Sequence, residues 1–429
     1  MKDEIVVIDG LRSPIAKANG TLNNLSADNL GAIIAKELVL KTQIPYELFD
    51  EVIIGNVAQP ADAANIARVL AVKAGFPQSI PAYTVHRNCA SGMQAISSAI
   101  EKIKSEQGSL YLVGGVESMS NIPLLFQDSF KDFMTKFTYS KGLKNKLSVL
   151  SSFQFKSLKP IIGLLSGLTD PISGKIMGIT AENLANEFKI SRETQDKYAL
   201  ESHLKAQKAQ ENGVLNDEIH PIISKDSSFF TDDGIRLNQT KEALGKLRPI
   251  FDRVSGSVTA GNSSQVSDGA CMLIVTTMSK AKELNLEPLG IIKDYAYAGL
   301  EASRMGLGPI YATKKLFDKT GTKLSDIDIV ELNEAFSAQV LANLEAFKSD
   351  EFCQKTFNCD ALGEIDRDIL NVNGGAIALG HPVGMSGARV VLTALKQLKR
   401  ENKKRALATL CVGGGQGASF LLEAYNEKL

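Results

Sequence analysis

The sequence predicts an α/β fold that contains two copies of one strand–helix–strand unit. The first observation is that short apolar strands alternate with segments of helical spacing, a pattern typical of a sheet whose two faces are both covered. The second is that a helix opened by Ser-Gly, followed by a strand that ends at paired glycines, occurs near both ends of the chain. The third is a basic, phenylalanine-containing segment that separates the copies and matches neither.

The elements of each copy follow from apolar spacing and glycine punctuation. In the first copy we expect strands at 4–8, 51–55 and 110–115 and helices at 30–40 and 91–104. In the second copy we expect a strand at 326–331, a helix opened by Ser386 and Gly387, and a strand at 407–414. These matches indicate an internal duplication whose two units pack face to face. The alternative is a chance likeness between two α/β segments.

The copies are separated by an insertion at about 121–255. Residues 121–168 carry seven lysines and two aspartates, an excess of five positive charges in a chain with 48 basic and 48 acidic residues. Phenylalanines 126, 130, 133 and 137 fall on one helical face, and 191–212 reads as a polar helix stopped by glycine. We therefore divide the chain into 1–120 plus 256–288, the insertion 121–255, and 289–429.

The composition of the chain argues against several classes of protein. A chain of 429 residues is too long for one core, and its formal net charge of zero gives no indication of nucleic-acid binding. The five cysteines show no regular spacing, which argues against a disulfide framework, and Cys271 is expected in the core. The start of the sequence lacks a signal-peptide pattern, and no apolar run is long enough to cross a bilayer. We expect a cytoplasmic protein.

Cys89 is the candidate nucleophile because it lies between a predicted strand and a predicted helix, in the run Asn-Cys-Ala-Ser-Gly. A helix dipole contributes about 0.3–1 kcal/mol, whereas lowering a thiol pKa from about 8.5 to 7 takes about 2 kcal/mol. The dipole alone is insufficient, so a base is needed. The alternative is a small buried hydrophobic residue, as most free cysteines are.

His381 is the candidate base. It lies in a glycine-rich loop, and glycines let a backbone approach a ligand closely. Of the other histidines, His203 and His220 are expected to be solvated, and His86 could line a pocket or only pack. A structural role for His381 is the alternative.

Three further residues complete the candidate constellation. Cys411 and Gly413 lie at the end of the predicted strand at 407–414, where ligands bind in open α/β sheets, and could move a proton and offer a backbone N–H to an oxyanion. Asn333 also follows a strand and could polarise a carbonyl or cap a helix. The small polar residues of 256–269 suit hydrogen bonds to an amide-bearing ligand. Cys353 and Cys359 have no second ligand pair nearby, so we expect no metal site.

Together these segments resemble the thiolases, across essentially the whole chain. The resemblance is carried by four motifs in order: Asn88-Cys-Ala-Ser-Gly, Asn333-Glu-Ala-Phe, Gly380-His-Pro and Cys411-x-Gly-Gly-Gly. It implies a duplicated αβαβα five-layer fold with an inserted loop domain. It also implies an acetyl-CoA acyltransferase that cleaves 3-ketoacyl-CoA, with CoA as a substrate and no tightly bound cofactor.

The resemblance assigns a role to each motif residue. Cys89 would be acylated, His381 would activate it, and Asn333 would hold a water in the oxyanion hole. Cys411 would protonate the leaving acetyl-CoA carbanion, and Gly413 would share a second oxyanion hole with Cys89. The residues expected to bind substrate are Ser264, Phe336 and Met177.

The length and the insertion look most similar to the β-subunit type of the fatty-acid oxidation trifunctional complex. That type usually has His-Glu-Ala-Phe where this chain has Asn333-Glu-Ala-Phe, which leaves acyl chain length open. A homodimer or homotetramer is expected, with a hydratase/dehydrogenase α-subunit as a further partner class. The alternatives are a biosynthetic acetoacetyl-CoA thiolase, a ketoacyl-synthase-type condensing enzyme, and a non-catalytic acyl-CoA carrier. For 121–168 we expect a channel cover, a membrane or partner contact, or a plain solvated helix.

Overall fold

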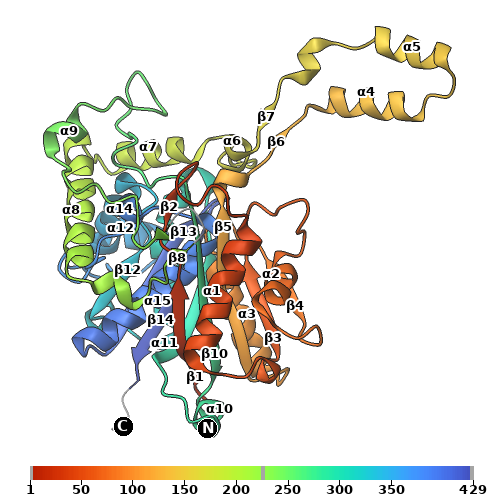
Figure 1. Cartoon of the computed structure of the whole chain (residues 1–429). Coiled ribbons are helices and arrows are strands. Elements are labelled where there is room, and N and C mark those ends of the chain that lie inside the picture. Colours follow the sequence, from red (N-terminus) through yellow and green to blue (C-terminus); the bar gives the residue numbers. More distant parts are fainter. Residues whose placement is uncertain (1–2, 224–227, 426–429) are drawn as a thin grey trace.

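The computed structural model describes residues 3–223 and 228–425 (Figure 1). The first half of the fold is built from β1 (Ile5–Arg12), β2 (Ala16–Lys17), α1 (Ala27–Thr42), β3 (Glu51–Gly55), α2 (Ile66–Ala74), β4 (Ala82–Val85), α3 (Ser91–Lys104), β5 (Leu110–Ser118), β10 (Ser267–Thr277) and α10 (Met278–Glu283). The second half is built from β11 (Gly290–Gly299), α11 (Gly308–Thr320), β12 (Ile329–Leu332), α12 (Ser337–Lys348), α13 (Asp350–Phe357), α14 (Ala376–Leu379), α15 (Val383–Glu401), β13 (Arg405–Val412) and β14 (Gln416–Ala424).

The insertion contributes β6 (Leu124–Leu125), α4 (Asp128–Tyr139), α5 (Leu143–Ser151), β7 (Ile161–Ile162), α6 (Gly163–Gly167), α7 (Met177–Glu187), α8 (Arg192–Glu211), β8 (Ile222–Ile223), β9 (Ser228–Phe229) and α9 (Lys241–Gly245). Single 3-10 turns occur at Tyr46–Leu48, Met119–Asn121, Phe155–Leu158, Val214–Asp217, Ala302–Leu307 and Leu324–Asp326. No helix within the described ranges is both long and apolar enough to span a membrane.

The sheet repeats one strand order in its two halves. Hydrogen bonds join the strands as β12-β13-β14-β11-β1-β10-β5-β3-β4, with β2 paired to β10. Read outward from the junction, β1-β10-β5-β3 corresponds to β11-β14-β13-β12. In each half, the strand associated with the paired glycines is parallel to its outer neighbour. In the first half β5 pairs with β3, and in the second half β13 pairs with β12. The predicted duplication is therefore confirmed at the level of topology.

Strand side chains alternate between two cores, and this alternation produces the layers. In β5, Leu112 belongs to the core under α1 and α2, whereas Val113 belongs to the core that holds α3 and α15. In β13, Leu407 packs in the core with α11, whereas Ala408 packs in the core with α3 and α15. The inner core is thus shared by both half-sheets. The resulting order is helix, sheet, helix, sheet, helix, which is the five-layer fold expected for this sequence.

Glycines permit the closest approach inside this core. A β-carbon on Gly115 of β5 would lie 2.0 Å from the carbonyl oxygen of Gly384, in the first turn of α15. Contacts that short do not occur between real atoms, so a side chain here would push helix and strand apart. The paired glycines therefore bring the start of α15, and the loop that carries His381, against the end of β5.

The first part of the insertion forms an arm that projects from the body (Figure 1). The ribbon β6–β7 is its base, with Leu124 paired to Ile162, and α4 and α5 lie farther out. The predicted phenylalanine stripe is found, although α4 begins after Phe126. The rings of Phe130 and Phe133 lie 6.4 and 4.8 Å from that of Phe153 on the returning branch. Phe130 and Phe133 of the stripe thus pack against the returning branch, whereas Phe126 is 58% exposed and no residue of α4 is fully buried.

The second part of the insertion packs on the body. The predicted helix at 191–212 is confirmed as α8, whose first turn is capped by a hydrogen bond from the Thr194 N–H to Ser191 Oγ (3.1 Å). The expected solvation of His203 is wrong. Its side chain is buried and its Nδ1 accepts the N–H of Arg236 at 3.2 Å, because this face of α8 is covered by the following loop. Cys271 is fully buried in β10, as predicted. The numerical bounds of the three parts remain predictions.

Candidate functional site

Cys89 lies in a tight turn between β4 and α3. Asn88, the residue before it, has a φ of 43°, in the left-handed region that few residues other than glycine adopt. The Arg87 N–H donates to Ser91 Oγ (2.9 Å), and the Ser91 hydroxyl donates to the Asn88 carbonyl (2.7 Å). These bonds hold the turn, so Cys89 is presented directly before the first turn of α3.

Cys89 borders a cavity of about 590 Å³ with mostly apolar walls. Its lining comes from both halves of the fold and from the insertion. The lining residues beside Asn88 and Cys89 are Val57, Ala58, Gln59, Met119, Ile122, Pro123, Leu125, Gly163, Leu164, Ser166, Gly167, Leu168, Thr169, Asp170, Pro171, Ile172, Met177, Val383, Gly413, Gly414 and Gln416. The base of the arm is therefore one wall of the cavity.

Gly413, in the second half, lines this cavity, whereas Cys411, two residues before it, is buried and is not a lining residue. Gly413 lies in the turn after β13, its carbonyl accepts the Asn88 Nδ2–H at 2.8 Å, and its backbone N–H is close enough to Cys89 to lower the pKa of that thiol. Cys411, near the end of β13, is buried, and a charge on Cys89 would raise its pKa. The two predicted thiols are thus close enough to interact, with Cys89 before α3 of the first half and Cys411 on β13 of the second.

Burial sets the protonation state of both thiols. Burial raises the pKa of Cys89, while hydrogen bonds from the N–H groups of Gly413 and Cys89 itself lower it less, and the carboxylate of Glu117 raises it further. Burial also raises the pKa of Cys411 far above its ordinary value. Both sulfurs are therefore thiols at neutral pH, so Cys89 needs a base, and Cys411 has a proton to give.

His381, the candidate base, is held in position by its neighbours. Its Nδ1 lies 2.6 Å from Ser386 Oγ, and the Ser386 hydroxyl donates to the Pro382 carbonyl at 2.9 Å. Because the serine has only one hydrogen, His381 carries its proton on Nδ1 and leaves the lone pair on Nε2. Burial, with a contribution from Arg389, lowers the pKa of His381 to about 3, which keeps the ring neutral at neutral pH.

His381 lies beside the cavity, because the residues that follow it in the sequence line the cavity or contact α3. Val383 lines the cavity with Cys89, and a β-carbon on Gly92 of α3 would lie 3.2 Å from the carbonyl oxygen of Gly384. His381 Nε2 is buried and has no hydrogen-bond partner in the described part of the chain. Leaving such an atom unpaired costs roughly 1–3 kcal/mol, so its retention favours a functional role.

Asn333 is another buried residue with an unpaired side-chain atom. Its N–H donates to the Thr409 carbonyl (3.0 Å) on β13, and its Oδ1 lies 3.4 Å from Arg389 Nη2. Its Nδ2 is buried and unpartnered within 3–223 and 228–425. The helix-capping alternative is not what the structure shows, because α12 begins only at Ser337. The Asn333 side chain thus offers a free amide donor close to Arg389, whose positive charge also acts on His381. Such a donor suits a bound oxygen atom.

Of the three predicted substrate-binding residues, one lines the cavity and two do not. Met177 lines the cavity, and its Sδ would lie 3.6 Å from a β-carbon on Gly413. Phe336 belongs with Met177 and Cys411 to one apolar cluster, and the Ser264 N–H donates to the Ala335 carbonyl at 2.9 Å. Neither Ser264 nor Phe336 lines the cavity itself. The same polar loop also supports the base, because the His381 N–H donates to the Gln265 carbonyl (3.2 Å).

Sequence reasoning missed several residues of this site. The wall at 163–172, which begins with the short helix α6, gave no motif. Ser386 was noted only as a helix start, whereas it sets the tautomer of His381. Arg389 and Glu117 lie within apolar runs and carried no spacing signal. None of the described residues forms a cluster of three His, Cys, Asp or Glu side chains able to hold a metal.

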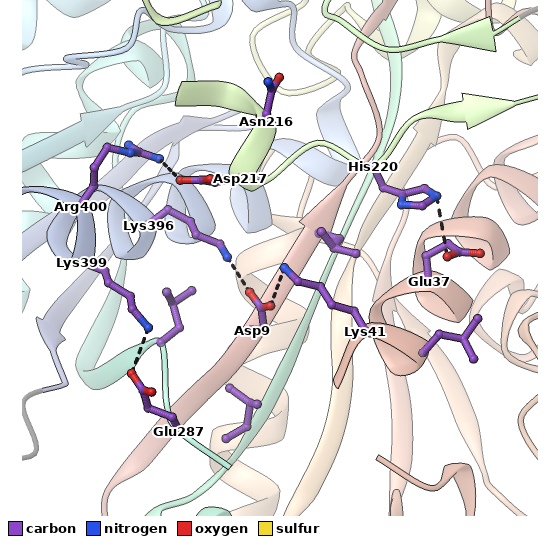
Figure 2. Close-up of a pocket in the computed structure, with 14 residues that line it drawn as sticks. Asp9, Glu37, Lys41, Asn216, Asp217, His220, Glu287, Lys396, Lys399 and Arg400 are labelled. Atoms are coloured by element: carbon purple, nitrogen blue, oxygen red, sulfur yellow. Dashed lines mark hydrogen bonds and ion pairs between the residues drawn. The ribbon is translucent and has the colours of Figure 1, made fainter. Parts of the chain in front are cut away.

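A larger cavity of about 980 Å³ lies elsewhere (Figure 2). Its charged side chains are paired with one another: Lys396 and Lys41 each contact Asp9 at 2.7 Å, and Lys399 contacts Glu287 at 3.0 Å. It lies at the C-terminal end of α15, whereas the Cys89 cavity lies at the N-terminal end, about 25 Å away along the helix. It contains no cysteine. We therefore assign the chemistry to the Cys89 cavity.

Comparison with known families agrees with this fold. Residues 5–279 match the model described as thiolase, N-terminal domain, and residues 286–424 match that described as thiolase, C-terminal domain. The duplicated α/β fold with a cysteine at the cavity between its halves defines the class. The chain belongs to the thiolase family.

Particular relatives match over nearly the whole chain. A 3-ketoacyl-CoA thiolase of Photorhabdus laumondii is 38% identical over 98% of this chain and 97% of that protein. A probable acetyl-CoA acyltransferase of Staphylococcus aureus is also 38% identical, over 98% and 99%. The crystal structure of human mitochondrial 3-ketoacyl-CoA thiolase in complex with CoA has a TM-score of 0.85 and 34% identity, covering 99% of this chain and 98% of that one.

Proposed function

We propose that this protein transfers an acyl group to CoA through Cys89, cleaving 3-ketoacyl-CoA into acetyl-CoA and a shortened acyl-CoA. The observation that carries the proposal is that Cys89 and Gly413 line one cavity, with the buried Cys411 thiol close enough to Cys89 for a charge on one sulfur to act on the other. The printed names of the relatives and the CoA in the human enzyme support this substrate class.

The residues divide the reaction into two half-reactions. His381 Nε2 takes the proton of Cys89, and the thiolate attacks the 3-keto carbon of the substrate. The bond between C2 and C3 breaks, its electron pair stays on the acetyl-CoA fragment, and Cys411 protonates that carbanion. CoA gives its proton to the Cys411 thiolate and attacks the acyl-Cys89 thioester; the shortened acyl-CoA leaves, and His381 returns its proton to Cys89. Because every step is reversible, the same residues serve synthesis of acetoacetyl-CoA.

Each half-reaction passes through an oxyanion that needs preorganised donors. The backbone N–H groups of Cys89 and Gly413 suit the oxygen that develops on the acyl carbon beside the nucleophile. His381 and a water held by Asn333 Nδ2 suit the thioester oxygen of the acetyl-CoA fragment. The two unpaired buried atoms described above support this second assignment.

We expect the enzyme to act on chains longer than acetoacetyl-CoA, because the apolar wall at Leu125, Leu164 and Ile172 extends the cavity beyond Cys89. The test is kcat/KM for thiolysis of 3-ketoacyl-CoA from C4 to C16. Leu164→Trp should lower kcat/KM for long chains by about tenfold or more and spare C4, since a filled apolar pocket loses several methylene contacts. Leu165→Trp is the matched control, because Leu165 is exposed and outside the cavity lining. A profile that falls steadily from C4 would contradict the long-chain assignment.

We also infer that the arm contacts an anionic membrane surface. Its lysines outnumber its acids by seven to two, and it exposes apolar side chains, including Tyr139, Leu143, Leu147 and Phe155, at 80, 76, 56 and 82% exposure. A basic surface with protruding apolar groups suits anionic lipid, to which each lysine contributes about 1 kcal/mol near the surface. A partner protein is the competing occupant.

Replacing 127–159 by a short glycine linker should remove most of the affinity for phosphatidylserine vesicles while sparing thiolysis, because β6 and β7 at the cavity wall are kept. A milder variant is Leu143→Ser with Leu147→Ser. Its matched control is Leu204→Ser, an exposed leucine of α8 on the body. Sedimentation with vesicles at two salt concentrations measures the effect. Equal vesicle affinity with and without the arm, in folded protein, would exclude the membrane contact.

Assembly and location remain proposals. β4 is an end strand of the sheet and its residues are only partly buried, so it can pair with a second copy. A homodimer or homotetramer, a hydratase/dehydrogenase α-subunit as partner, and a cytoplasmic location agree with the family expectation. Sedimentation velocity of the purified chain tests the first of these.

A further inference from the structure

Glu117 is a buried carboxylate that the reaction scheme leaves without a role. It lies near the end of β5 and is fully buried. Four N–H donors converge on it. Oε1 accepts from Ala58 N (3.0 Å) and Asn56 Nδ2 (3.2 Å), and Oε2 accepts from Val57 N (3.0 Å) and Gly384 N (2.9 Å).

These donors come from separate walls of the Cys89 cavity. Val57 and Ala58 belong to the loop after β3 and line the cavity. Gly384 follows Val383, another lining residue, and lies three residues after His381. A β-carbon on Gly384 would lie 2.7 Å from Glu117 Oε2, so the loop is in direct contact with the carboxylate. The Glu117 side chain therefore connects the end of β5, the cavity wall at 57–58 and the loop that carries His381.

We propose that Glu117 is a positioning residue, whose carboxylate holds the His381 loop and the 57–58 wall in place around Cys89. The role rests on the proposed function. It calls for a carboxylate rather than an amide because each oxygen accepts from two N–H groups. An amide of the same shape would turn its NH₂ group toward two donors, with no acceptor to receive its hydrogens.

The charge of Glu117 has a second consequence. Burial has the larger effect on the pKa of Cys89, and the charge of Glu117 raises that pKa further, so the carboxylate adds to the preference for a protonated resting nucleophile. Burial raises the pKa of Glu117 to about 7, and its donors lower it less. The other titratable groups around it are Asp268 on β10 and Cys89 on the α3 side. As pH falls below about 7, protonation of Glu117 places a hydrogen among four donors, and activity should fall.

The experiment compares Glu117→Gln with Asp268→Asn. Asp268 is a buried carboxylate on the neighbouring strand that accepts from Ser120 N at 2.9 Å and does not line the cavity. For E117Q we expect kcat to fall about 10²-fold with a smaller change in KM, the cost of a displaced catalytic group. We also expect alkylation of Cys89 by iodoacetamide to begin at lower pH than in the wild type. D268N should keep the wild-type kcat.

Alkylation needs no turnover, so it separates failure of this role from failure of the proposed function. A wild-type protein that alkylates at Cys89 but does not cleave 3-ketoacyl-CoA would contradict the proposed function. Wild-type kcat in E117Q, or a reduced kcat with an unchanged alkylation profile, overturns the role of Glu117. If E117Q does not fold, Glu117→Asp keeps the charge but withdraws it from its donors. It should lose kcat without the shift in alkylation, and wild-type kcat in E117D would be equally decisive against the proposal.

Discussion

Replacing Cys89 with alanine is expected to abolish acyl transfer, by on the order of 10⁴-fold or more, as removal of a catalytic nucleophile does in other enzymes. No neighbouring group can substitute. Cys411 is 1% exposed and burial raises its pKa far above the ordinary value, so it is not available as a second thiolate. The measurement is thiolysis of a 3-ketoacyl-CoA of medium length, together with the mass of the protein after exposure to substrate without free CoA.

The mass measurement makes this result specific. Wild-type protein should gain the mass of one shortened acyl group, and C89A should gain none while still binding acyl-CoA. The matched control is Cys359→Ala, which removes a partly exposed thiol in the second half, away from the cavity. Retained acylation in C89A would refute the nucleophile assignment. Turnover without any acyl-enzyme would instead indicate a direct transfer.

Replacing His381 with alanine should give the second largest effect. Removing an oxyanion donor costs on the order of 10²–10³ in rate, and loss of the general base adds to that cost. Substrate binding should change less than kcat, because the ring acts on the reacting atoms. The assay is single-turnover acylation of Cys89, followed at several pH values. Near-normal thiolysis in H381A would refute its role.

The pH dependence of the wild type gives an independent check on His381. Its pKa is lowered to about 3 by burial and by Arg389, so the ring is neutral and able to accept a proton throughout pH 5–9. Activity should therefore show no acid limb from His381 near its ordinary pKa of about 6.5, and because the limb expected near 7 belongs to Glu117, that limb should be absent from E117Q. His220→Ala is the matched control, because His220 lines the other cavity, 3.8 Å from Glu37. Loss of activity in that variant would point to a general effect of removing a histidine.

Local sequence predicted the regular elements of the first copy closely. The strand at 51–55 and the helix at 91–104 have the expected bounds, since apolar spacing and terminal glycines act within a few residues. In the second copy the bounds shifted. The helix begins at Val383 rather than Ser386, because Pro382 ends the preceding loop and suits a helix start. The strand begins at Ile329 because Leu324–Asp326 forms a 3-10 turn.

Side-chain environments were predicted less well than elements. The polar pattern of α8 suggested a solvated His203, yet the following loop covers that face. The wall at 163–172 and the clamp at Glu117 depend on segments that are distant in sequence and meet only in the folded chain. No periodicity within one segment reports such a meeting.

The sequence by itself determined the duplication, the order of strands and helices, and the residue types able to act as nucleophile, base and proton donor. These follow from short-range patterns, because apolar periodicity and glycine positions fix local backbone. Only the tertiary structure decided which cavity receives those groups, which nitrogen of His381 carries its proton, and which carboxylate joins the walls. Those features depend on burial and on hydrogen bonds between the two copies and the insertion, and such contacts exist only once the layers have packed.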